Sequence, residues 1–97
     1  MVRYLSLIRF TEQGMHNVGE SVQRASTFRS AVSAAGGKII AQYWAMGPSD
    51  GCIVFEAPDR TTAAGLLLKL NMAGNVRTES TELFDDQEFT AIVKKTG

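Results

Sequence analysis

The chain has 97 residues, of which 44% are hydrophobic, and this size and composition predict one globular domain over residues 1–97. Ten basic and ten acidic side chains cancel, so the charge balance argues against nucleic acid or an anionic membrane as a partner. Cys52 is the single cysteine, which excludes an intrachain disulfide and favours a reducing, cytoplasmic setting. We expect no signal peptide, and no run approaches the roughly 20 apolar residues that a membrane helix needs.

The first third of the chain predicts a strand, a loop and a helix. Residues 2–10 alternate between two faces that both carry apolar side chains, which predicts a strand inside a sheet. Residues 11–19 predict a loop with room for one helical turn. Apolar residues at helical spacing predict a helix from Ser21, the expected N-cap, to about Ala35. Gly36-Gly37 is expected to end this helix in a left-handed cap.

The middle of the chain reads as strand, tight turn, strand. Residues 38–46 predict the second strand, and a Gly-Pro-Ser-Asp-Gly sequence at 47–51 predicts a chain reversal. Pro48 fixes its own φ, and Gly51 is free to adopt a positive φ in the turn. The third strand, residues 52–57, is short and almost wholly apolar, which favours a central position in the sheet.

The last third predicts a helix, a strand and a short helix. Asp59 is the expected N-cap of the second main helix, whose broad Leu66-Leu67-Leu68 run predicts that it is the better buried of the two. Residues 75–84 alternate but are mostly polar, as expected of a strand at an edge or across from a partner. Asp85 followed by Glu88 predicts a capping box on the final helix.

The element order β-α-β-β-α-β, with a short helix added, predicts an α+β fold. Two β-α-β units with right-handed crossovers give a ferredoxin-like plait, with a four-stranded antiparallel sheet and both main helices on one face. The other face would then expose large apolar side chains, because Trp44 and Met46 lie on one face of the second strand and Tyr43 on the other. Soluble monomers rarely expose such a patch, so we predict a homodimer or higher homo-oligomer.

Several motifs spread over nearly the whole chain resemble one known family. They are residues 7–14, Tyr43-Trp44 before the turn residues Gly47, Asp50 and Gly51, residues 56–59, residues 74–80, and the closing Phe84, Glu88 and Phe89. On these motifs the chain resembles the GYD domain proteins. One position departs from the family: Ser49 stands where its namesake tyrosine usually lies. If that tyrosine does chemistry, this chain has lost it, and if it only packs, little changes.

The resemblance to the GYD domain proteins supports the predicted fold and homo-oligomer but implies no reaction. The architecture is also similar to that of the dimeric α+β barrel proteins. That group includes cofactor-independent monooxygenases, isomerases and haem enzymes, but a shared fold is weak evidence of a shared function.

Two residues are candidates for catalysis. His16, the only histidine, is either a general base, a metal or haem ligand, or an exposed loop residue. No His or Cys spacing supplies further ligands, so we expect no metal. Asp50 either orients a ligand or acts as a base, or else bonds the backbone of its own turn, as an Asp before a Gly often does.

Five residues are candidates for ligand binding. Arg77 and Glu79 share a strand face, where they form either a pocket for a small polar or anionic ligand or an ion pair that fixes strand or subunit register. Tyr4, Tyr43 and Trp44 either line a cavity between the sheet and its partner or pack in the core or the interface.

Two classes of function remain open. The absence of a recognisable catalytic constellation favours a homo-oligomeric module that binds a small metabolite or a protein, without a cofactor. The alternative is a small cofactor-independent or haem-handling enzyme, such as a monooxygenase or isomerase, with His16, Asp50, Arg77 and Tyr4 around its cavity. That alternative requires His16 or Asp50 to converge on one enclosed pocket.

Overall fold

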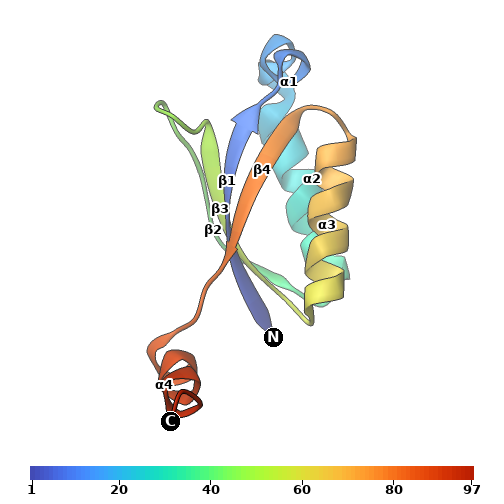
Figure 1. Cartoon of the computed structure of the whole chain (residues 1–97). Coiled ribbons are helices and arrows are strands. Elements are labelled where there is room, and N and C mark those ends of the chain that lie inside the picture. The colour runs from blue at the N-terminus through green and yellow to red at the C-terminus, as the bar shows by residue number, and fades with distance from the viewer.

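The computed structural model describes residues 1–97 and has a four-stranded antiparallel sheet with two long helices on one face (Figure 1). The elements are β1 (Val2–Phe10), α1 (Glu12–His16), the 3-10 turn η1 (Val18–Glu20), α2 (Ser21–Ala34), β2 (Lys38–Trp44), β3 (Gly51–Ala57), α3 (Arg60–Met72), β4 (Val76–Glu82) and α4 (Asp86–Lys94). The strand order is β2-β3-β1-β4, so β1 and β3 are central and β4 is an edge strand. The predicted ferredoxin-like order with a C-terminal helix is confirmed.

Strand register divides the side chains of the sheet between a helix-covered face and a helix-free face. On β3 the buried Ile53 and Phe55 point toward α2 and α3, whereas the half-buried Cys52 and Val54 point away. The helix-free face carries Arg3, Leu5, Leu7 and Arg9 of β1, Lys38, Ala41 and Tyr43 of β2, Cys52, Val54 and Glu56 of β3, and Arg77, Glu79 and Thr81 of β4.

The core lies between the helices and the helix-covered face. Phe55 is fully buried there, with Phe28 of α2 edge-on at a ring-centroid distance of 5.8 Å. The prediction that the second main helix is the better buried is wrong, because α3 contributes only Ala63 to the buried core whereas α2 contributes Phe28 and Val32. Leu68 is 63% exposed, since a step of about 100° per residue turns it away from the sheet.

Local signals set most of the element ends. Gly36 and Gly74 follow α2 and α3 with φ of 85°, as the left-handed helix cap requires. The Asp59 side chain accepts from the backbone N–H of Thr62, which confirms this N-cap. Ser21 is not an N-cap, because it is the first residue of α2 and Glu20 precedes it without a side-chain bond.

Gly51, which follows the turn between β2 and β3, is needed for a different reason from the one predicted. Gly51 has no positive φ, and it already lies in β3. A Cβ atom at this position would lie 2.8 Å from the carbonyl oxygen of Tyr43, so close strand approach explains the glycine. A bulge at Ile40 shifts the register of β2, and Trp44 therefore faces the helix-covered side while Tyr43 faces the helix-free side.

Helix α4 projects beyond the end of the sheet where β1 begins, on the side away from α2 and α3 (Figure 1). We call this end, near Val2 and Glu82, the lower end, and the opposite end, near Phe10 and Val76, the upper end. The capping box between Asp85 and Glu88 is present as predicted. No residue of α4 is buried. No helix of the structure combines the length and the apolar character needed to cross a bilayer.

Candidate ligand cavity and the charged ends of the sheet

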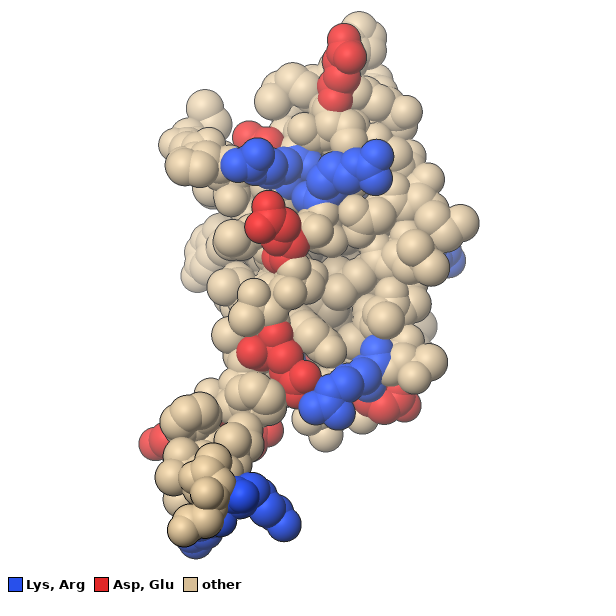
Figure 2. All heavy atoms as spheres, viewed as in Figure 1, with Lys and Arg blue, Asp and Glu red and all other residues tan.

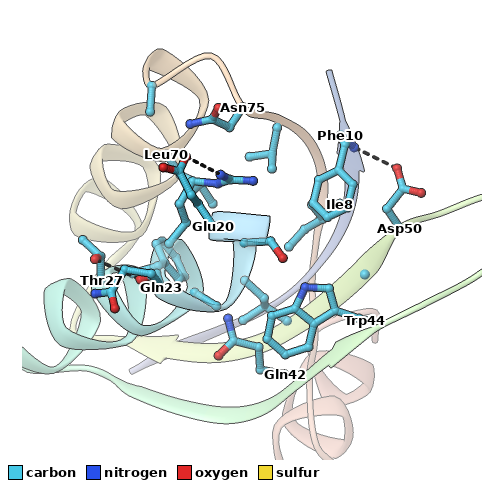
Figure 3. A pocket seen from close by; sticks show the side chains of 18 of the residues that line it. Ile8, Phe10, Glu20, Gln23, Thr27, Gln42, Trp44, Asp50, Leu70 and Asn75 are labelled. Carbon is cyan, nitrogen blue, oxygen red and sulfur yellow. Dashed lines mark hydrogen bonds and ion pairs between the residues drawn. The ribbon is translucent and has the colours of Figure 1, made fainter. Parts of the chain in front are cut away.

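A cavity of about 440 Å³ opens between the helix layer and the upper end of the sheet. Its apolar wall includes Ile8, Phe28, Trp44, Leu66 and Leu70 (Figure 3). The first half of α2 contributes small side chains to its wall, such as Ser21 and Ala25. This volume lies within the range of small-molecule sites, roughly 300–1,000 Å³.

Asp50 lies at the wall of this cavity and closes the end of β1. Its Oδ2 accepts from the backbone N–H of Phe10 at 2.8 Å, the bond drawn in Figure 3. Its own backbone N–H donates to the carbonyl of Ile8 at 2.8 Å. The alternative that the Asp50 carboxylate bonds its own turn is therefore wrong, because it bonds β1 instead. These bonds fix the carboxylate at the upper end of the sheet.

Arg24 of α2 is a polar residue of the cavity wall that the sequence did not single out. Its Nη1 donates to the carbonyl of Asn17 at 3.0 Å and lies 3.9 Å from the mostly exposed carboxylate of Glu20. Its Nη2 is buried and has no hydrogen-bond partner. An unpaired buried donor costs about 1–3 kcal/mol, so this nitrogen favours an acceptor nearby. The only signal in the sequence was an arginine next to the apolar stripe of α2.

His16 does not reach the cavity. It is the last residue of the short helix α1, and its side chain is exposed. Of the two candidate catalytic residues, the cavity wall therefore includes Asp50 alone. No group of three or more His, Cys, Asp or Glu side chains is arranged to hold a metal ion.

The structure separates the five candidate ligand-binding residues. Tyr4 packs in the core, where its ring stacks on Phe55 at a centroid distance of 6.0 Å. Trp44, at 48% exposure, lines the cavity. Tyr43 borders the cavity too, but its strand position directs it to the helix-free face. Arg77 and Glu79 lie on the helix-free face as well. Of the five candidates, only Trp44 both lines the cavity and lies on the helix-covered face of the sheet.

Two arginines lie opposite each other near the upper end of the helix-free face. Arg9 of β1 is the cross-strand neighbour of Arg77 of β4. Neither forms an ion pair within the chain, so the predicted pairing of Arg77 with Glu79 does not occur in it. Figure 2 shows a band of basic atoms across this end of the molecule. Like charges directly opposite each other are destabilising, so the pair favours an anionic partner.

At the lower end, one arginine joins the first strand to the last helix. Nε and Nη2 of Arg3 donate to Glu56 Oε2 at 3.1 and 3.0 Å, and Nη1 donates to Glu88 Oε1 at 2.9 Å. The hydrogen bond to Glu88 and then the one to Glu56 raise the pKa of Arg3. The pKa of Glu88 is lowered, first by the backbone N–H of Asp85 and then by Arg3. The start of α4 is thus held against β1.

The fold and this cavity define a small α+β protein of ferredoxin-like architecture. The model of the GYD domain matches residues 4–93, and the chain therefore belongs to the GYD domain family. No curated protein matches the chain.

Among solved structures, the chain is similar to the crystal structure of TTHA0845 from Thermus thermophilus, with a TM-score of 0.54 and 18% sequence identity. The match covers 88% of this chain and 95% of that one. An identity this low supports the shared fold and carries no information about function.

Proposed function

We propose that this GYD domain protein is a homo-oligomeric binding module that holds a small, largely apolar molecule in the cavity between α2, α3 and the sheet. The observation that carries the proposal is the cavity of about 440 Å³ with its mostly apolar wall. Trp44 offers a flat ring at the entrance, and Leu70 lies across from it (Figure 3). A cavity with an apolar wall and a few polar groups is the usual form of a metabolite site.

The polar groups of the wall favour a ligand that also carries a hydrogen-bond acceptor. Nη2 of Arg24 is a donor without a partner, and an acceptor placed beside it would remove the cost of its burial. A molecule with an apolar body and one carboxylate or sulfonate combines both properties.

The helix-free face supports the homo-oligomeric part of the proposal. Leu7 is 40% and Tyr43 67% exposed at neighbouring positions of this face, on either side of the half-buried Cys52. Covering such side chains with a second copy removes apolar surface from water, at about 25 cal/mol per Å². Sedimentation equilibrium tests this part, and a clean monomer at 100 µM would contradict it.

The cavity is tested with 1-anilinonaphthalene-8-sulfonate, an apolar dye with one anionic group. We expect the folded protein to bind the dye, and Ala25→Phe, which fills the cavity from α2, to weaken the affinity at least tenfold. Ala64→Phe on the exposed side of α3 is the matched control, because it adds the same side chain away from the cavity. Equal dye affinity of the two variants, at unchanged thermal midpoints, would refute the proposed site.

A further inference from the structure

We propose that α4 is an exchanged arm, whose apolar side packs on the upper end of a second copy of this chain. This inference rests on the proposed homo-oligomer and names the element that completes its interface. It follows from three observations: α4 is unpacked in its own chain, its start is fixed at the lower end, and the upper end offers an apolar and basic surface.

Helix α4 has an apolar stripe that its own chain does not cover. Phe89, Ile92 and Val93 follow helical spacing and are 56%, 39% and 51% exposed. The helix has nine residues, and isolated helices shorter than about 12–15 residues are marginal in water. The capping box and the exposed apolar stripe therefore indicate that α4 packs against another surface.

The start of α4 is fixed, and this determines where the stripe can pack. Glu88 is bound to Arg3, and the backbone N–H of Leu83 continues the ladder of β4 by donating to the carbonyl of Arg3 at 2.8 Å. From this anchor α4 extends past the lower end of the sheet, on its helix-free side (Figure 1). The stripe consequently leaves the helix-free face of its own chain uncovered.

The upper end offers a surface that complements α4. On the helix-free face this end carries Tyr43 at 67% exposure, and the Met46 side chain at the tip of the β2–β3 turn is fully exposed. The tip projects to the same side of the sheet as α4, at the opposite end (Figure 1). Arg9 and Arg77 lie at the same end of the helix-free face without acidic partners, whereas Asp85 and Asp86 at the start of α4 are exposed.

Two copies can pack with their helix-free faces together around a twofold axis that is perpendicular to the strands. This arrangement provides a partner both for the apolar stripe and acidic start of α4 and for the exposed turn and arginine pair at the upper end. It places the lower end of each copy over the upper end of the other, so each α4 meets the turn and the arginine pair of its partner. A twofold axis parallel to the strands would instead bring the two arginine pairs together, and like charges oppose that arrangement. Charge therefore selects the reciprocal arrangement.

The apolar contact is tested by sedimentation equilibrium of the full chain. We expect Phe89→Ser with Ile92→Ser to raise the dimer dissociation constant at least tenfold. Because neither side chain is buried in its own chain, the monomer should keep its thermal midpoint. Gln87→Ser with Ala91→Ser, on the opposite side of α4, is the control and should change the constant less than threefold. A dimer that both variants leave unchanged refutes the arm but not the homo-oligomer, whereas a monomeric wild type refutes both.

The direction of the contact is tested by reversing charge. Arg77→Glu and Asp86→Arg should each weaken the dimer at least fivefold, since each places like charges in contact across the interface. The two substitutions combined in one chain should restore the dimer to within threefold of wild type. Absence of this restoration would refute the placement of α4 over the arginine pair.

Discussion

The two faces of the sheet differ in how far one chain completes them. On β3, Phe55 is 0% and Ile53 3% exposed because α2 and α3 cover them, whereas Cys52 and Val54 on the same strand remain half-buried. Both sets of side chains are apolar, so residue type does not explain the difference. The difference shows that the two helices cover one face only, and that the other face stays partly open to solvent.

The largest expected effect is on the helix-covered face. Phe55→Ala removes the ring that packs between Tyr4 and Phe28, and we expect it to lower the free energy of unfolding by about 3–5 kcal/mol. Val54→Ala, the neighbouring position on the helix-free face, should cost about 1 kcal/mol in the monomer. Urea unfolding at sub-micromolar protein measures both, and equal losses would show that the faces do not differ as described.

A second prediction concerns a polar pair within the helix-covered face. Ser6 is fully buried, and its Oγ lies 2.7 Å from the Oγ of the exposed Ser80. We expect Ser80→Ala to cost about 1–3 kcal/mol, because it leaves a buried hydroxyl unpaired. Ser6→Ala should cost only about 1 kcal/mol, because water replaces the bond to Ser80. The reverse order in chemical unfolding would show that the Ser6 hydroxyl has another partner.

The smallest effect is expected at the start of α4, where a fall in pH should destabilise the helix without destabilising the core. The pKa of Glu88 is lower in the folded chain, so its contribution is present near neutral pH and is lost as the pH falls through the folded value. As the pH falls through that value, the amide protection factors of α4 should drop while those of β3 stay high. Glu88→Gln should produce the same change at pH 7, because it removes the charge that pairs with Arg3. Simultaneous loss of protection in α4 and β3 would contradict a separate arm.

Features that depend on sequence neighbours were predictable. The left-handed cap at Gly36 and the capping box of Asp85 and Glu88 each involve residues a few positions apart. Strand alternation likewise gave the two sides of β1. The bond from Phe10 to Asp50 spans 40 positions and that from Arg3 to Glu88 spans 85, so no local pattern encodes them.

The candidate site was less predictable than the fold for the same reason. Trp44 was a candidate ligand residue, and it does line the cavity. Tyr4 was also a candidate ligand residue, but it lies in the core. Alternation divides a strand into two faces without showing which face the helices cover. Arg24 was missed because its unpaired nitrogen depends on how α2 sits over the sheet. Cavities arise between elements, and the sequence describes the elements one at a time.

The central position of β1 also bears on the order in which the protein is made. This strand is synthesised before the other three strands, but its neighbours in the sheet are residues 51–57 and 76–82. Closing such long loops is slow, and β1 carries two unpaired edges until the later strands leave the ribosome. A growing chain therefore completes its sheet only after residues 76–82 have left the ribosome. Until then, β1 is a ready target for chaperones and for mispairing with other chains.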